Sequence, residues 1–304
     1  MNDLVFSPAI GASLDAWRRD RQVDVERALE AWVPSDTPAA LGEAMRYAVL
    51  DGGKRLRPLL VLATSEALGG SHQAAMRAAC AVELIHAYSL VHDDMPCMDD
   101  DVLRRGKPTV HVRYGEAQAL LAGDALQALA FELLVPDDGS VPDAMAARLC
   151  RLLARAAGAG GMAGGQAIDL ASVGVALDQP SLEAMHRLKT GALLQASVMM
   201  GAATAQAGAA QLAGLAEYGA CLGLAFQVVD DVLDVTADSQ TLGKTAGKDA
   251  AADKPTYVSL MGLDAAQAYA EEVIERAHRA LGDSGLPSPG HLHGLADWVG
   301  RRSH

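Results

Sequence analysis

Two clusters of aspartate interrupt otherwise apolar stretches of the sequence. The first covers residues 93–101 and the second residues 230–234; their acidic members are Asp93, Asp94, Asp99, Asp100, Asp101, Asp230, Asp231 and Asp234. Burying like charges together is unfavourable unless cations join them. Carboxylate sites suit Mg²⁺, which shares its remaining positions with water and substrate phosphates. We therefore predict a magnesium site that binds a phosphate or diphosphate.

Basic residues that would bind such an anion also occur in compact motifs. Residues 52–58 read Gly-Gly-Lys-Arg-Leu-Arg-Pro, and a second basic run, residues 104–107, follows the first aspartate cluster directly. The paired glycines would let the backbone approach an anion closely. Further lysines lie at Lys189, Lys244 and Lys254. Each motif alone is most often a solvated surface, but beside two aspartate clusters they indicate one shared anion site.

Helices must position these residues, because good helix formers dominate the chain and aromatic residues make up only 4% of it. We expect a bend at residues 158–165, N-caps at Ser71 and Ser181, and a helix disrupted by Pro96. The helices are expected over residues 13–32, 38–51, 55–69, 72–96, 115–134, 141–157, 181–206, 209–236, 256–261 and 264–282.

Helical spacing bears on the aspartates. Asp230 and Asp234 are four residues apart and share one face of a helix, as do His86 and Asp93. Two such helices facing each other would bring both clusters to one mouth of a helical bundle, where such sites usually lie.

The composition restricts the class of protein. The chain has 304 residues, half of them hydrophobic, and no linker, so we predict a single domain over residues 1–304. A net charge of −13 argues against a nucleic-acid-binding surface. Four widely spaced cysteines and an N-terminus without signal-peptide features predict a cytoplasmic protein without disulfides. Residues 191–216 carry no charge but are too weakly apolar to span a membrane, so no membrane span is expected.

Together the motifs resemble one family. In order and spacing the chain is similar to the short-chain trans-prenyl diphosphate synthases, and most closely to bacterial farnesyl diphosphate synthases. The resemblance extends from about residue 40 to 262 and is carried by residues 52–58, 83–101, 103–106, 164–170, 189–193, 223–234 and 242–244. It implies an all-α, isoprenoid-synthase-type helical bundle around a central cavity, usually a homodimer. It also implies head-to-tail condensation of isopentenyl diphosphate with an allylic diphosphate, with three Mg²⁺ per active site.

The resemblance also implies a role for each matching residue. Asp93, Asp99 and Asp230 would be the metal ligands, with Asp94, Asp231 and Asp234 as close supporters. Isopentenyl diphosphate would be held by Gly53, Lys54, Arg57, His86 and Arg105. The allylic diphosphate would be held by Arg104, Lys189, Lys244 and Lys254, with Thr190 and Gln227 near the reacting carbons.

Product length should depend on the residues beneath the first cluster. Tyr88 and Ser89 lie one helical turn before Asp93, about 6–8 Å deeper along the axis. The ring of Tyr88 could block a lengthening tail, although a core aromatic is an equal reading. The inserted Pro96-Cys97 pair resembles the C15 pattern. We therefore predict farnesyl diphosphate, made from dimethylallyl and then geranyl diphosphate; geranyl or geranylgeranyl diphosphate is the alternative.

Readings from other classes explain less of the sequence. A ferritin-like di-iron protein uses Glu-x-x-His pairs, and the chain has them at residues 83–86, 183–186 and 275–278. That motif leaves the aspartate clusters and basic motifs unexplained. A P-loop reading of residues 243–245 lacks the first glycine and a preceding strand. For Gln166 and Asp169 we favour structural hydrogen bonds between helices.

Overall fold

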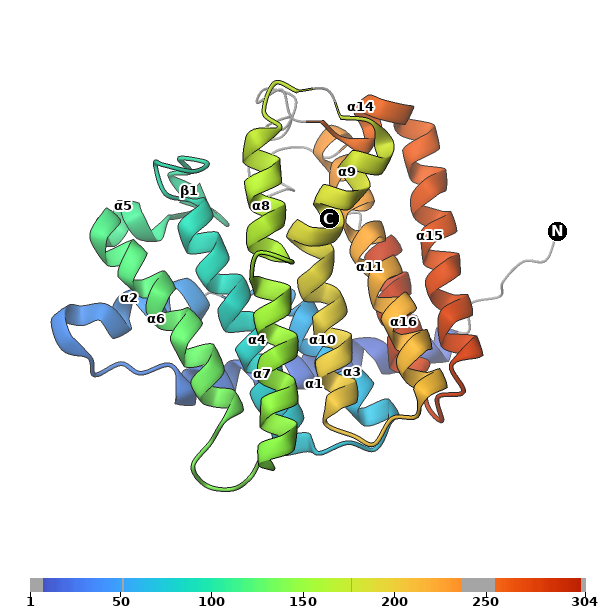
Figure 1. Cartoon of the computed structure of the whole chain (residues 1–304), viewed down its shortest axis with the longest axis horizontal. Coiled ribbons are helices and arrows are strands. Elements are labelled where there is room, and N and C mark those ends of the chain that lie inside the picture. Colours follow the sequence, from blue (N-terminus) through green and yellow to red (C-terminus); the bar gives the residue numbers. More distant parts are fainter. Residues whose placement is uncertain (1–7, 51, 176, 237–254, 302–304) are drawn as a thin grey trace.

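Helices make up most of the described structure and nearly all of its regular secondary structure (Figure 1). It is a computed structural model that describes residues 8–50, 52–175, 177–236 and 255–301. The fold is all-α, as predicted. Its helical elements are α1 (Pro8–Trp32), η1 (Pro38–Ala40), α2 (Leu41–Val49), α3 (Leu56–Ala67), α4 (His72–Asp93), α5 (Val110–Tyr114), α6 (Glu116–Leu134), α7 (Asp143–Ala157), α8 (Met162–Ala171), α9 (Gln179–His186), η2 (Arg187–Gly191), α10 (Ala192–Ala203), α11 (Ala209–Thr236), α14 (Tyr257–Met261), α15 (Leu263–Asp283) and α16 (Gly290–Gly300). A short antiparallel hairpin, β1 (Leu103–Arg104) and β2 (Lys107–Pro108), follows the first aspartate cluster.

Helix α4 lies at the centre of one half of the bundle. It packs against α3 and α6, while α10 packs against α3, α7 and α11, and α11 packs against α15 (Figure 1). Residues on every side of α4 are buried, which fits its almost continuous apolar sequence. One apolar core surrounds α4 and α6, and a second joins α3, α10, α11, α15 and α16. The two aspartate-bearing helices, α4 and α11, therefore belong to different halves, bridged by α10.

Several predicted elements agree closely with the structure. Helix α11 has the predicted bounds, and most other predicted helices agree within a few residues. Ser71 caps α4 as predicted, because its side chain accepts a hydrogen bond from the Ala74 amide at 3.3 Å. The predicted cap at Ser181 is wrong. Asp178 caps α9 instead, and its carboxylate accepts a hydrogen bond from the Ser181 amide at 3.0 Å.

Other predicted elements differ from the structure. Residues 181–206 are not one helix: α9 passes into a π-helical turn, η2, before α10 begins. The bend expected at residues 158–165 ends at Gly161, and α8 starts at Met162. Helix α4 ends at Asp93, before Pro96. The hairpin, α5 and α16 were not predicted, because the hairpin and α5 are too short to show a periodic apolar pattern.

Three helices, α4, α6 and α11, are long and apolar enough to cross a membrane by length and composition. The most apolar part of α4 is 72% buried within the bundle, against 44% for α6 and 50% for α11. The uncharged stretch at residues 191–216 is divided between α10 and α11 by a break after Ala203. The expectation of no membrane span stays a prediction.

Candidate active site

The first aspartate cluster folds back onto the end of α4. The backbone amide of Asp99 donates to the carbonyl of Asp93 at 2.9 Å, and that of Asp101 donates to the carbonyl of Asp94 at 3.1 Å. Burial raises the pKa of Asp93 to about 6; Lys189 opposes this rise and the nearby carboxylate of Asp99 adds to it. The turn therefore brings Asp99 beside Asp93, and their shared role as metal ligands stays a prediction.

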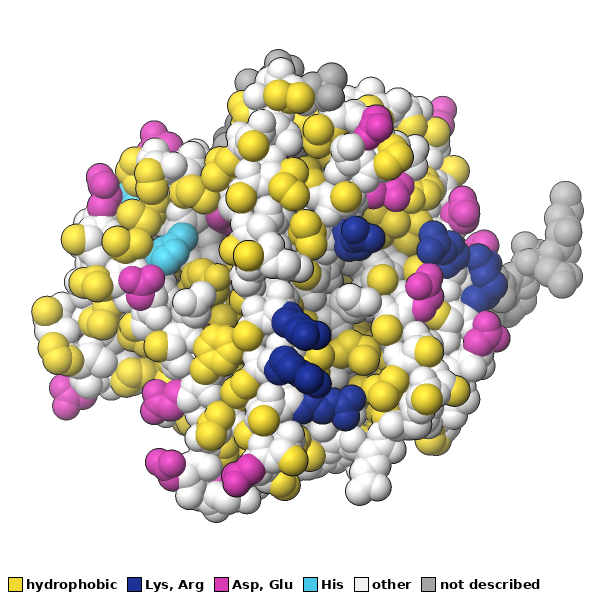
Figure 2. Space-filling model, in the orientation of Figure 1, with side chains coloured by type: hydrophobic (Ala, Val, Ile, Leu, Met, Phe, Trp, Pro, Cys, Tyr) yellow, Lys and Arg dark blue, Asp and Glu magenta, His cyan; other side chains and the backbone are white. Residues whose placement is uncertain are grey.

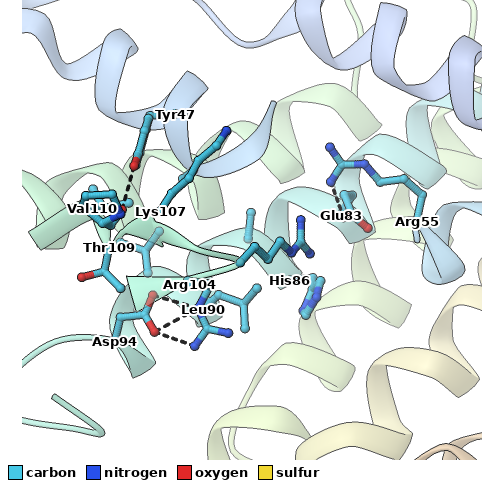
Figure 3. Close-up of a pocket in the computed structure, with 15 residues that line it drawn as sticks. Tyr47, Arg55, Glu83, His86, Leu90, Asp94, Arg104, Lys107, Thr109 and Val110 are labelled. Atoms are coloured by element: carbon cyan, nitrogen blue, oxygen red, sulfur yellow. Dashed lines mark hydrogen bonds and ion pairs between the residues drawn. The ribbon is translucent and has the colours of Figure 1, made fainter. Parts of the chain in front are cut away.

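Asp94 points to a different partner. Its side chain is only 2% exposed, and the Arg104 guanidinium donates from Nε to both carboxylate oxygens at 2.9 Å. Burial raises the pKa of Asp94, and the hydrogen bonds from Arg104 oppose that rise. Because Arg104 lies on strand β1, this ion pair ties the hairpin to the end of α4 (Figure 3).

A pocket opens beside this ion pair (Figure 3), with an empty volume of about 550 Å³ including its open mouth. The side chain of His86 lines it. Burial, followed by the positive charges of Arg57, Arg105, Arg104 and Arg55, holds the pKa of His86 well below its usual range. A neutral imidazole surrounded by guanidinium groups is an environment that suits a highly charged anion. The lining residues are Tyr47, Ala48, Arg55, Glu83, His86, Ala87, Leu90, Val91, Asp94, Arg104, Arg105, Lys107, Pro108, Thr109 and Val110.

The two basic motifs of the sequence meet at this pocket. The guanidinium of Arg105 donates to the carbonyl of Gly52 at 2.5 Å. Gly53 has a φ of +133°, and a Cβ there would lie 2.8 Å from Arg105 Nη1, so only glycine fits. Lys54 is exposed, and its carbonyl accepts a hydrogen bond from Gln22 at 3.0 Å. The structure thus brings Gly53, Arg57, His86 and Arg105 close together, and their role in binding a diphosphate, like that of Lys54, stays a prediction.

The second aspartate cluster remains helical to the end of α11. Asp231 is 3% exposed and both of its oxygens are used: Gln227 Nε2 donates to one at 2.9 Å, and the Tyr257 amide donates to the other at 2.9 Å. Asp234 is buried and Asp230 is partly exposed. This leaves Asp231 in a fixed position between α11 and the start of α14.

The turn η2 connects the two clusters. The Thr190 hydroxyl donates a hydrogen bond to the Gln227 side chain at 3.1 Å. The amide group of Gln227 in turn donates to the carboxylate of Asp231. Lys189 lies close enough to Asp93 to influence its pKa and also contacts Asp169 of α8 at 2.5 Å. The bridge that we favoured for Asp169 is therefore an ion pair between α8 and η2. The buried amide of Gln166 has no hydrogen-bond partner among the residues that the structure describes.

Glycines on two neighbouring helices hold η2 in place. A Cβ on Gly165 of α8 would lie 2.1 Å from the Lys189 backbone nitrogen, and one on Gly223 of α11 would lie 2.7 Å from Gly191 Cα. The helices approach η2 this closely only because these side chains are absent. Since a π-turn holds one more residue than an α-turn, it sets the direction of Lys189 and Thr190.

Tyr88 lies below Asp93, between α4 and α6. It is 9% exposed, and its ring meets the His92 ring edge-on at 5.6 Å. Burial raises the pKa of Tyr88, and a hydrogen bond with the side chain of Gln127 on α6 opposes that rise. The Ser89 hydroxyl donates to the carbonyl of His86 at 2.9 Å. Of the two predicted chain-length residues, only Tyr88 presents a bulky side chain.

Magnesium ligation is judged from the donors that are present. Among the residues that the structure describes, no three His, Cys, Asp or Glu side chains converge into a ready-made metal site. The neighbouring carboxylates of Asp93 and Asp99 nonetheless fit Mg²⁺, which is held by one or two carboxylates with water and phosphate completing its ligands. Lys244 and Lys254 lie outside the described residues.

The ion pair between Glu83 and Arg55 was not predicted from the sequence. Glu83 is buried in α4 and pairs with Arg55, whereas the sequence reasoning gave Glu83 no role in the site. A carboxylate in an apolar helix one turn before His86 was the available signal. The Glu-x-x-His pairs do not converge: Glu183 accepts a hydrogen bond from Tyr269, and His278 contacts His293 on α16.

Comparisons with known proteins agree with this geometry. The polyprenyl synthetase family model matches residues 38–283. A chloroplastic geranylgeranyl pyrophosphate synthase of Catharanthus roseus is 44% identical over 300 residues, covering 98% of this chain and 84% of that protein. A probable farnesyl diphosphate synthase of Bradyrhizobium diazoefficiens is 48% identical over 298 residues, covering 93% and 88%.

Two solved structures are also similar to this chain. An FPP/GFPP synthase from Zymomonas mobilis has a TM-score of 0.85 at 39% identity, covering 95% of this chain and 99% of that one. A geranyltransferase from Helicobacter pylori, complexed with magnesium and isoprenyl diphosphate, has a TM-score of 0.81 at 33% identity and covers 97% of both chains.

Proposed function

Because the chain belongs to the polyprenyl synthetase family, as a short-chain prenyl diphosphate synthase, we propose that it makes farnesyl diphosphate. It would condense isopentenyl diphosphate first with dimethylallyl diphosphate and then with geranyl diphosphate. The observation that carries this proposal is the pocket beside the first aspartate cluster, where His86 lies near Arg55, Arg104 and Arg105 and within the field of Arg57.

The proposed reaction begins when the allylic C–O bond breaks to give a carbocation and diphosphate. Asp93, Asp99 and Asp230 would hold Mg²⁺, which neutralises charge on the leaving diphosphate. Lys189 and Arg104 would bind that diphosphate directly. In the structure, both cations contact carboxylates, Asp169 and Asp94 respectively. An anion that competes for these cations would draw them toward itself, which couples binding to reorganisation of the site.

The second substrate must reach the carbocation before water does. The basic pocket would hold isopentenyl diphosphate through Lys54, Arg57, His86 and Arg105, and the apolar helices would keep the reacting carbons dry. The oxygens of Thr190 and Gln227, 3.1 Å apart, would lie near the positive carbon. A proton is finally lost, and the departing diphosphate is the acceptor that we propose.

Product assays test the proposed function. Purified protein is incubated with isopentenyl diphosphate and each allylic starter, with Mg²⁺ or with EDTA, and the products are sized by mass spectrometry. We expect C15 diphosphate from both C5 and C10 starters, and no product with EDTA. A dominant C20 product would reject the farnesyl assignment in favour of the activity named for the Catharanthus relative. No product from any starter would reject the function itself.

Tyr88 is the residue proposed to stop the growing chain. Its buried ring below Asp93 supports this role. Tyr88→Ala should shift the main product from C15 toward C20 or longer. Tyr88→Phe keeps the ring and loses only the contact with Gln127, so its products should stay at C15. Unchanged products in Tyr88→Ala would show that another residue sets the length.

We also propose a cytoplasmic homodimer. Helices α5 and α6 leave Val112, Leu120 and Leu121 about half exposed, at 49%, 47% and 52%. Apolar side chains grouped on one surface suit contact with a second copy. Analytical ultracentrifugation should give twice the mass of one chain, and Leu120→Glu with Leu121→Glu should give a monomer. A monomeric unaltered protein would contradict the proposal.

A further inference from the structure

Arg55 lies between two basic neighbours but differs from both. Lys54 is exposed and Arg57 is partly exposed, whereas Arg55 is only 4% exposed. Its backbone is left-handed, with φ +48° and ψ +34°, just before the first residue of α3. Residues other than glycine rarely adopt this conformation, and it persists only where the surrounding structure fixes it.

Three helices supply the contacts that fix Arg55. Its Nε donates to Glu26 of α1 at 2.6 Å, its Nη1 to Glu83 of α4 at 2.6 Å, and its Nη2 to the Val49 carbonyl at the end of α2 at 2.6 Å. Figure 3 shows the Arg55–Glu83 pair beside His86. With its guanidinium bonded in three directions, Arg55 acts as an anchor for the turn that carries it.

Glu83 is the centre of this anchor. It is 4% exposed and lies three residues before His86 on α4, so both side chains project from the same face and line the same pocket. A buried carboxylate is unfavourable unless a cation compensates it, and Arg55 does so. In return, Glu83 and Glu26 balance the charge of Arg55, which leaves Arg55 less suited than its neighbours to bind a diphosphate.

We infer that Glu83 and Arg55 are positioning residues for the isopentenyl diphosphate half of the site. By fixing the backbone of residues 52–57 against α1, α2 and α4, they hold Lys54 and Arg57 toward His86. Neither residue would touch the reacting carbons. The inference rests on the proposed function, and it predicts that the two substrates respond differently when the anchor is removed.

Steady-state kinetics with each substrate varied in turn test the inference. Arg55→Gln and Glu83→Gln should each raise the KM for isopentenyl diphosphate about tenfold, because a displaced binding group loses much of its effect. The KM for geranyl diphosphate should stay within about twofold, because Arg104 and Lys189 are held by other partners, Asp94 and Asp169. Glu26→Gln should have a weaker effect, since the Glu26 side chain is 35% exposed.

The double variant Arg55→Gln/Glu83→Gln separates positioning from stability. Arg55→Gln leaves the buried Glu83 without its partner, and Glu83→Gln leaves Arg55 with only the partly exposed Glu26, so each single variant should lower the melting temperature. The double variant leaves neither buried charge and should recover part of the loss. The KM for isopentenyl diphosphate should not recover, because the turn is still unanchored. Arg77→Gln is the matched control: Arg77 also lies on α4 and bonds a carboxylate, Asp138, and a carbonyl, Leu133, away from the pocket.

Three results would overturn the inference: equal changes in both KM values, recovery of the KM together with the melting temperature, or the same KM change in Arg77→Gln. Calorimetric titration with isopentenyl diphosphate alone reads the pocket without turnover. Wild-type binding without product formation would reject the proposed function, and the variants would then be judged by their affinities. An unaltered chain that neither binds nor turns over would overturn both.

Discussion

Asp94 and Asp231 occupy the same place in the two aspartate clusters and are equally buried, at 2% and 3% exposure, yet their partners differ. Asp94 is bound by the Arg104 side chain from the hairpin. Asp231 is bound by a backbone amide and by Gln227 of its own helix. A diphosphate can compete for an arginine but not for the amide of a buried helix end. The ion pair of the first cluster can therefore rearrange when a diphosphate binds, whereas the side chain of Asp231 in the second cluster should keep its position.

The largest loss of activity should come from replacing the first aspartate of each cluster, Asp93 or Asp230. At this position the two clusters should respond alike. Asp93→Asn and Asp230→Asn should each lower kcat/KM by about 10³-fold or more, because both are proposed metal ligands. Circular dichroism should show unchanged helicity. Asp143→Asn, on the surface of α7, is the control and should keep full activity. Near-normal turnover in either cluster variant would contradict the ligand assignment.

The second aspartates should separate the clusters. Asp94→Asn loses the charge that holds Arg104 and should lower kcat/KM by about 100-fold. Asp231→Asn keeps a neutral acceptor for the Tyr257 amide and should cost only about tenfold. Raising the concentration of the allylic substrate should not fully restore the rate of either variant. Equal losses in the two variants would remove the distinction between an adaptable and a fixed cluster.

Acid should weaken the support behind the second cluster. His186 stacks on Tyr257, whose amide binds Asp231, and burial lowers the pKa of His186 to about 4. The unfolded chain, with an ordinary histidine pKa of 6.5, then binds more protons than the folded one between those values. The contribution of His186 to the free energy of unfolding is therefore fully present above pH 6.5 and is lost as the pH falls toward 4.

Urea unfolding at pH 7.5 and pH 5 measures this effect. The linkage predicts a loss of about 2 kcal/mol from His186. His186→Phe can still stack on Tyr257 and should remove that part of the loss. The exposed His72→Phe should leave it unchanged. An identical pH dependence in wild type and His186→Phe would exclude His186 as the source.

The smallest effect concerns the metal-free protein. Burial raises the pKa of Asp93 from its usual 3.8 to about 6, so between those values the folded chain binds more protons, and above pH 6 the buried charge destabilises it. In EDTA at pH 7.5, Asp93→Asn should raise the free energy of unfolding by about 1 kcal/mol, since partial exposure screens the charge. Asp94→Asn should lower it, because Arg104 loses its partner. Changes of the same sign would contradict this view of the first cluster.

The sequence predicted long helices better than their interruptions. Helix α11 was located to the residue, because its apolar pattern is long and continuous. The turn η2 was hidden in an equally good helical sequence, since its cause lies in contacts with α8 and α11. The start of α8 was taken for a bend because glycine weakens helix propensity, yet Gly165 is there for close packing.

The candidate site shows the same division. Residue types and order placed both aspartate clusters and the basic motifs in one site, and the structure brings the basic motifs together beside the first cluster. Which charges neutralise each other could not be read from the sequence. Arg55 looked equivalent to Lys54 and Arg57, and only the fold shows that it is buried against Glu83. Pairing depends on distances between segments far apart in the chain.

The glycine contacts around η2 have a consequence for how this enzyme can change. Neither Gly165 nor Gly223 has room for a single methyl group, so the backbone beneath Lys189 and Thr190 is closed to gradual substitution. The contacts of Tyr88 with His92 and Gln127, by contrast, are contacts with side chains. Substitutions that change the product should therefore occur between α4 and α6. The backbone that carries Lys189 and Thr190 should stay the same.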